Sequence, residues 1–164
     1  MTANEDRSIR LDRMRFTKNK TSANLALLAI LFDVCFFISI YESDVGTYYY
    51  NILVGASILY NLIFMLAAFL CSEGVKNYKA GYAWLMGALG LGQLARIFIY
   101  PMKAHAAVVT VQDVPSAVMG DAQFTRTVVF LCLSAACLLV GAVIGVIRSR
   151  ALAAHIASLD SRAA

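Results

Sequence analysis

Four strongly polar side chains interrupt the apolar stretches of this 164-residue chain. Asp33 and Asn61 lie in the first two stretches, and Gln93 and Arg96 lie together in the third. A carboxylate, a guanidinium and two amides can form a hydrogen-bonded ion pair, or a site that takes up a proton or a cation. Because Asp or Arg at the centre of a membrane helix costs about 2.5–3.5 kcal/mol, such residues need either partners or a function.

The four polar residues fall in one layer if each stretch is a helix that crosses a bilayer. Measured from the cytoplasmic end of each stretch, the depths are about 15 Å for Asp33 and Asn61, about 18 Å for Gln93 and about 22 Å for Arg96. Gln93 and Arg96 also share a helix face through their i,i+3 spacing. We therefore predict one polar cluster of these four residues inside a helix bundle, with Arg96 as the counter-ion of Asp33.

Three interpretations of this polar cluster stay open. It can be a structural lock that fixes how the helices pack, since hydrogen bonds between membrane helices stabilise their association. It can be a functional polar site, because charged residues within membrane spans often mark pathways of ions or protons. The residues can also have separate roles, with the Arg96 side chain extending to the outer interface and no partner for it in the bilayer.

The composition requires a bilayer around the elements that position this cluster. Hydrophobic residues make up 60% of the chain and charged residues 15%, whereas a soluble domain has about 45–50% and about 25%. Four apolar runs approach the length of about 20 residues that a membrane helix needs. We predict an all-α integral membrane protein, an antiparallel bundle of four transmembrane helices. Its spans are placed at about 23–41, 51–71, 81–100 and 128–147, with a basic segment at 1–22, an outer loop at 101–127 and a C-terminal tail at 148–164.

The distribution of basic residues predicts the orientation. With the N-terminus inside, eleven Lys and Arg residues lie in the inner segments and two, Lys103 and Arg126, in the outer ones. This asymmetry obeys the positive-inside rule. We therefore expect a multi-pass protein of the cell membrane with both termini in the cytoplasm. The net charge of +4 is explained by this topology and does not indicate a nucleic-acid partner.

Small residues at helical spacing predict close helix packing or a face for a partner. Small side chains let membrane helices approach closely, and the last span contains a GxxxG pair. The residues proposed for this role are Ser134, Cys137, Gly141 and Gly145 in the last span, and Gly87 and Gly90 in the third.

The motifs of enzymes and cofactor sites are missing from the sequence. The two histidines, His105 and His155, lie outside the predicted spans, and the four cysteines have no CxxC spacing. We therefore predict no catalytic residues, no cofactor and no metal.

The sequence predicts a non-catalytic subunit or accessory protein of a larger, transport-related membrane complex, which it contacts through the small-residue faces. Besides lipid, the expected partner is a membrane protein or a second copy of the chain. The alternative is a small proton- or cation-coupled transporter, monomeric or dimeric, that uses Asp33 paired with Arg96 and has an unknown substrate. An integral membrane enzyme is a third possibility, for which no nucleophile–base pair is visible.

Overall fold

The structure, a computed structural model, describes residues 4, 6, 18–41, 51–111 and 114–163. Within these residues, four helices are long and apolar enough to cross a membrane. They are α2 (Lys20–Ile40), α4 (Asn51–Lys76), α5 (Ala80–Ile99) and α7 (Asp121–Ala163). By length and composition, the chain is therefore a multi-pass membrane protein, and its four long helices cover the four predicted spans except for Tyr41 and Tyr100, each of which directly follows its helix.

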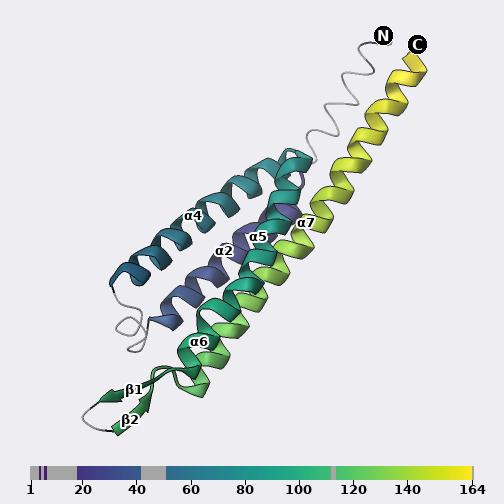
Figure 1. Ribbon diagram of the computed structural model, residues 1–164. Helices are drawn as coiled ribbons and strands as arrows, with labels where there is room; N and C mark the ends of the chain where they lie inside the picture. Colours follow the sequence, from purple (N-terminus) through teal and green to yellow (C-terminus); the bar gives the residue numbers. More distant parts are fainter. Residues whose placement is uncertain (1–3, 5, 7–17, 42–50, 112–113, 164) are drawn as a thin grey trace.

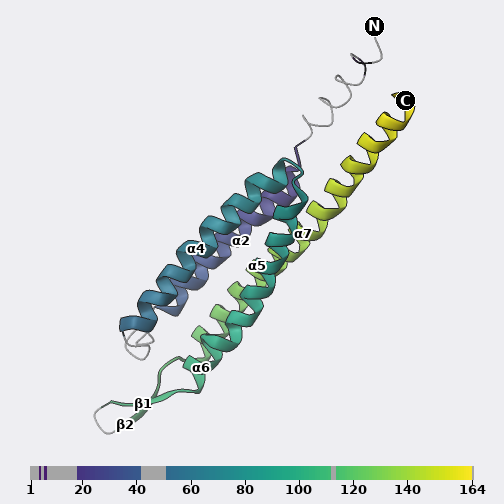
Figure 2. The same cartoon turned by 45° about the horizontal axis from the view of Figure 1, so that its top comes forward.

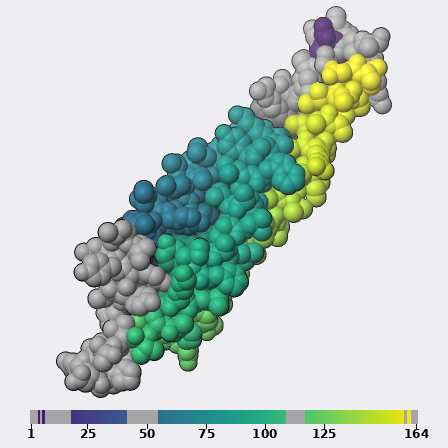
Figure 3. Space-filling view, in the orientation of Figure 1, coloured from purple at the N-terminus to yellow at the C-terminus, as the bar shows by residue number. Residues whose placement is uncertain are grey.

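Successive long helices run in opposite directions (Figure 1). α2 packs mainly against α4 and α7, and α5 packs mainly against the same two helices. A view turned by 45° shows the same arrangement, with the C-terminal part of α7 extending beyond the ends of the other three (Figure 2). In the space-filling view, α4 and α5 together cover much of one side of an elongated molecule (Figure 3).

The region predicted as an outer loop at 101–127 contains regular structure. A short helix, α6 (Pro101–Ala106), follows α5 directly, with proline in its first turn, where no amide donor is needed. Two short strands, β1 (Val108–Val111) and β2 (Val114–Ala117), then pair antiparallel. Because β1 is rich in β-branched residues, it favours an extended backbone. The first connection, at 42–50, lies outside the described residues.

Helix α7 extends beyond both ends of the predicted span at 128–147. It begins at Asp121, whose acidic side chain in the first turn is favourable at a helix N-terminus. It continues to Ala163, through the segment predicted as a tail. Residues 148–163 include several alanines and contain neither proline nor glycine, so nothing in their sequence ends the helix.

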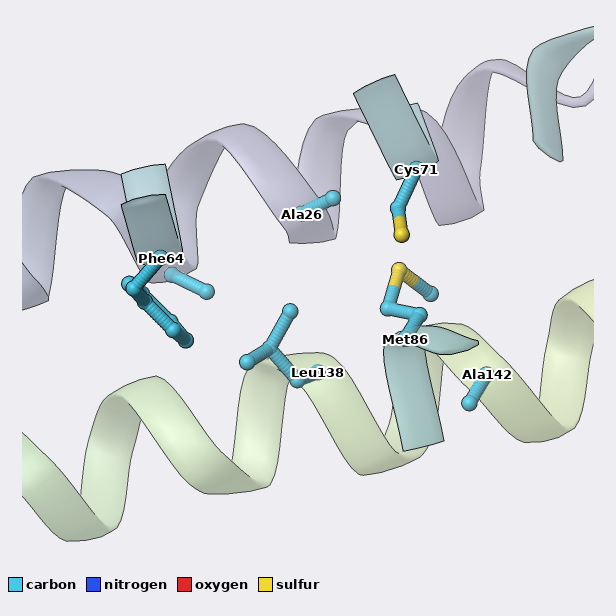
Figure 4. Close-up of a cluster of buried hydrophobic side chains, with 7 residues drawn as sticks. Ala26, Phe64, Cys71, Met86, Leu138 and Ala142 are labelled. Carbon is cyan, nitrogen blue, oxygen red and sulfur yellow. The ribbon is translucent and has the colours of Figure 1, made fainter. Parts of the chain in front are cut away.

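The core consists of two apolar clusters. The first cluster, shown in Figure 4, contains Ala26, Ala29, Phe64, Cys71, Met86, Leu138 and Ala142. The second contains Phe36, Ile40, Ala104, Val118, Met119 and Leu131. In the first cluster, the sulfur atoms of Cys71 on α4 and Met86 on α5 point toward each other (Figure 4). Between these two apolar clusters, each long helix contributes at least one polar side chain to the interior.

Candidate functional site

The four residues of the polar cluster meet between the two apolar clusters. Asp33 comes from α2, Asn61 from α4, and Gln93 and Arg96 from α5. Their exposed fractions are 1% for Asp33, 2% for Asn61, 0% for Gln93 and 2% for Arg96. All four side chains are therefore closed off from the surface of the molecule, and their polar groups depend on one another for hydrogen bonds.

The centre of the cluster is an ion pair between Asp33 and Arg96. Arg96 Nη1 donates to Asp33 Oδ1 over 3.0 Å. Gln93 Nε2 donates to the same carboxylate oxygen over 2.9 Å. Arg96 Nη1 also lies 3.5 Å from Gln93 Oε1, within the same face of α5. One oxygen of Asp33 thus accepts both principal donors of the cluster.

Hydrogen bonds extend from this ion pair to the other two helices. Arg96 Nη2 donates to Asn61 Oδ1 on α4 over 2.6 Å. Gln93 Nε2 lies 3.4 Å from Ser134 Oγ on α7, and that hydroxyl donates to the carbonyl of Ala29 on α2 over 3.0 Å. The network therefore connects all four long helices at one level.

Three aromatic rings surround the guanidinium of Arg96. Arg96 Cζ lies 4.2 Å from the ring centroid of Phe36, 4.9 Å from that of Tyr60 and 5.7 Å from that of Tyr100. A cation within about 6 Å of an aromatic face is attracted by the negative potential of the ring. The positive charge is therefore stabilised by Asp33 and by rings from α2, α4 and the residue after α5.

Part of the cluster's hydrogen-bonding capacity is unused. Among the described residues, Asp33 Oδ2, Asn61 Nδ2 and Arg96 Nε are buried and have no hydrogen-bond partner within the chain. The ion pair is thus formed through a single carboxylate oxygen. A buried polar atom without a partner costs about 1–3 kcal/mol, so these atoms favour a ligand or a rearrangement that would satisfy them.

The six small residues predicted for helix packing or for a partner are buried or partly buried in the molecule. Ser134, Gly141, Gly145 and Gly90 are buried, and Cys137 and Gly87 are partly buried. A Cβ atom on Gly145 would lie 3.0 Å from the Ala83 Cβ and 3.1 Å from Val75 Cγ1. A Cβ atom on Gly141 would lie 2.7 Å from Met86 Cε. The absent side chains therefore allow α7 to approach α4 and α5 within the same molecule.

A second group of polar contacts joins the helices at the end where α2 begins. Asn19 caps α2, with its Oδ1 accepting from the Ser22 amide over 3.4 Å and from Arg148 Nη1 over 3.1 Å. The backbone N–H of Asn19 donates to the carbonyl of Lys76 over 3.2 Å. Ser72 Oγ donates to the carbonyl of Ala23 over 3.1 Å. These contacts join α2 to both α4 and α7.

Sequence reasoning missed the aromatic rings, although their spacing contains a signal. Phe36 follows Asp33 by three residues, Tyr100 follows Arg96 by four, and Tyr60 precedes Asn61 directly. Residues three or four apart lie on one helix face, so Phe36 and Tyr100 could have been placed beside the charges. Ser134 was assigned to packing, and in the structure it is also a hydrogen-bonding member of the site.

In the part of the chain that the structure describes, no group of three or more His, Cys, Asp and Glu side chains lies close enough to hold a metal ion.

Comparisons with protein-family models, with curated proteins and with solved structures find no match to this chain. The polar cluster and the exposed surfaces of the helices are therefore the features from which a function can be argued.

Proposed function

We propose that the protein is a four-helix bundle of the cell membrane with both termini in the cytoplasm, and that it is a non-catalytic subunit of a larger membrane complex. The orientation is supported by the charges at the two ends of the molecule. At the end where α2 begins, Lys20 is its first residue, Lys76 is the last residue of α4, Lys79 precedes α5, and Arg148 bonds Asn19. Lys103 in α6 and Arg126 in the second turn of α7 belong to the opposite end (Figure 1). The basic end belongs in the cytoplasm under the positive-inside rule.

The length of α7 is the observation that carries this proposal. Its 43 residues correspond to about 65 Å at 1.5 Å per residue, roughly twice the thickness of a hydrocarbon core of about 30 Å. The part after Ile147, which we name the α7 extension, projects past the other helices (Figure 1). An isolated helix of this size is marginally stable in water, so contact with another surface would stabilise the part that extends past α2, α4 and α5.

The side chains of the α7 extension fit a helix-in-groove contact. Leu152 and Ile156 lie four residues apart and are already partly buried within the molecule, while Ala153 and Ala157 are exposed, so the exposed alanines are the positions open to a partner. An amphipathic helix of this kind can place its apolar positions in a groove of a partner protein. Because the small residues of the spans pack inside the chain, we assign the partner contact to the α7 extension rather than to them.

The exposed face of α4 offers a second contact surface within the membrane. It consists of large apolar side chains, namely Leu59, Leu62, Ile63, Leu66 and Phe69. Such a face is compatible with lipid and with the apolar helices of a membrane-protein partner.

Site-specific crosslinking in native membranes tests the accessory role. A photoreactive residue is placed at Ala153 or Ala157 in the extension, and at Ala88, an exposed position of α5, as the control. We expect the two extension positions to crosslink to the same membrane protein, and a chain ended after Arg150 to insert normally but fail to copurify with it. Crosslinks to lipid alone, or only to a second copy of this chain, would contradict the proposal.

A second candidate function is a small proton- or cation-coupled transporter. Asp33 supports it, because this buried carboxylate has one oxygen, Oδ2, with no partner among the described residues. A proton or a cation could bind there within the bundle. In liposomes with an imposed ion gradient, Asp33→Asn should abolish flux and Asp121→Asn, at a 97% exposed side chain, should preserve it. An absence of flux in the unmodified protein under every gradient would exclude this candidate.

A further inference from the structure

We propose that Asp33 and the three aromatic rings of Phe36, Tyr60 and Tyr100 form a binding site for a small organic cation, a guanidinium or alkylammonium ion, which Arg96 occupies in this structure with its own guanidinium. The inference rests on the second proposed function, the cation-coupled transporter, and names the substrate class of that site. Binding can be measured separately from transport.

The geometry of the site is that of a receptor for a cation. Asp33 Oδ1 lies 3.0 Å from Arg96 Nη1. The rings of Phe36, Tyr60 and Tyr100 lie 4.2, 4.9 and 5.7 Å from Arg96 Cζ and come from different parts of the chain. An anion and several aromatic faces around one position are the arrangement by which proteins recognise quaternary ammonium and related ions.

The ion pair leaves binding capacity for a competing cation. A guanidinium binds a carboxylate best through two parallel hydrogen bonds. Here Arg96 reaches one oxygen of Asp33, and both Asp33 Oδ2 and Arg96 Nε are buried with no hydrogen-bond partner in the described part of the chain. A free cation is not tethered to α5, so it can orient toward both carboxylate oxygens. A free cation can therefore compete with the Arg96 guanidinium for Asp33, even though the ion pair is buried.

The Arg96 side chain can move to the outer interface when a cation displaces it. It lies in the last turn of α5, which ends at Ile99 near the outer side of the proposed bundle. Long arginine side chains can extend to the membrane interface and keep the charged group hydrated. Tyr60, with 38% of its surface exposed, contributes to the site and also reaches the surface of the molecule. An incoming cation would reach Asp33 past Tyr60 while Arg96 moves outward.

Calorimetric titration of the purified full-length chain with methylguanidinium tests this proposal. We expect the wild-type chain to bind methylguanidinium and Arg96→Ala to bind it at least about tenfold more tightly, because the internal competitor is removed. Adding Asp33→Asn to Arg96→Ala should abolish binding. Equal affinity of wild type and Arg96→Ala, or binding that persists without the Asp33 carboxylate, would overturn the proposal. So would binding to Arg96→Ala with none to the wild type, because the natural chain would then always keep its own cation.

An aromatic variant in the Arg96→Ala background tests the rings, because in the wild-type chain Tyr60 contacts the internal competitor as well as the ligand. There, Tyr60→Ala should weaken methylguanidinium binding about two- to fivefold, the effect of one cation–π contact. Phe98→Ala, at an exposed aromatic residue outside the site, should leave it unchanged. If Arg96→Ala does not fold alone, methylguanidinium should restore its yield when present during expression and purification, and a lack of rescue would count against the site.

Flux measurements separate the failure of this inference from the failure of the transporter proposal. Binding of methylguanidinium without flux in liposomes would keep the site and reject transport. Flux of protons or metal cations without methylguanidinium binding would keep transport and reject this substrate class.

Discussion

Asp33 on α2 and Arg96 on α5 form a buried ion pair in which Arg96 Nη1 lies 3.0 Å from Asp33 Oδ1. Their two helices each pack mainly against α4 and α7 rather than against each other. The pair therefore crosses the middle of the helix arrangement, and bonds from its members and from Gln93 continue to Asn61 and Ser134 on the remaining helices. A change in either charge is consequently expected to affect all four helices.

The first prediction concerns the energetic coupling of this pair. Asp33→Asn and Arg96→Gln should each lower the free energy of unfolding by about 3–5 kcal/mol, because each leaves the other charge buried and uncompensated. The double variant should lose less than the sum of the two. Reversible unfolding in mixed micelles measures the stability of the wild type, the two single variants and the double variant, with Asp121→Asn as an exposed control. Additive losses would show that the two charges are not coupled.

A second prediction contrasts two glycines of the small-residue set. Gly145→Ala should destabilise the protein by about 1–3 kcal/mol, since the new Cβ would press on short side chains of Ala83 and Val75 that have little freedom to move. Gly87→Ala is the matched control. Its Cβ would lie at an ordinary 3.6 Å from the Ala142 Cβ, so the gain in helix propensity should leave stability unchanged or raised by up to about 1 kcal/mol. Thermal unfolding in detergent compares the two, and equal effects would refute the packing argument.

The turn between α4 and α5 gives a third prediction. A Cβ atom on Gly74, in the last turn of α4, would overlap Tyr82 Cγ and lie 2.7 Å from the Tyr82 Cβ, near the rigid base of that side chain. Gly74→Ala should therefore force the two helices apart and destabilise the chain by about 1–3 kcal/mol or more. Gly81→Ala, where nothing lies within 4 Å of the new atom, should be tolerated. A stable Gly74→Ala variant with an unshifted unfolding midpoint would contradict this account.

The long helices could be located from the sequence because hydropathy depends on composition, which is readable residue by residue. Their ends could not, because a helix continues as long as its backbone propensity allows, whether or not the bilayer has ended. This is why α7 passes Ile147 without interruption. The hairpin of β1 and β2 was missed because a four-residue strand such as Val108–Val111 is too short to show a clear period.

The polar cluster could be anticipated because the rise of a helix is constant, so Asp33 and Arg96 can be assigned to similar depths from sequence alone. The side-chain directions that create the site depend on how each helix is rotated about its axis, which hydropathy does not determine. Tyr60 shows that sequence position alone does not give side-chain direction. It precedes Asn61 in the sequence and is exposed, yet its ring centroid lies 4.9 Å from Arg96 Cζ.

The orientation of the bundle gives a fourth prediction. Fluorescent-protein fusions after Ala164 and after Lys79 should fluoresce, because the positive-inside rule predicts both positions in the cytoplasm. An alkaline phosphatase fusion after Gly120, in the segment between β2 and α7, should be active because that position is expected outside. Active phosphatase after Ala164 would reverse the proposed orientation.

The last prediction concerns Asn19, which is fully buried and connects three helices. Its Oδ1 accepts from the Ser22 amide and from Arg148 Nη1, and its backbone N–H donates to the Lys76 carbonyl. Asn19→Ala removes the cap and should cost about 1 kcal/mol of stability, within the range of about 0.5–2 kcal/mol for such losses.

Asn19→Asp separates the cap from the contact with Arg148. Aspartate caps helices about as well as asparagine, and beside Arg148 its carboxylate would gain a charged partner. Asn19→Asp should therefore be more stable than Asn19→Ala, and Arg148→Ala should reduce that difference. Chemical unfolding of Asn19→Ala and Asn19→Asp, each with and without Arg148→Ala, at low and high salt measures this difference in stability. If Arg148→Ala leaves the stability difference between Asn19→Asp and Asn19→Ala unchanged, the helix cap alone accounts for it. The contact between residue 19 and Arg148 would then not help to hold α7 against the start of α2.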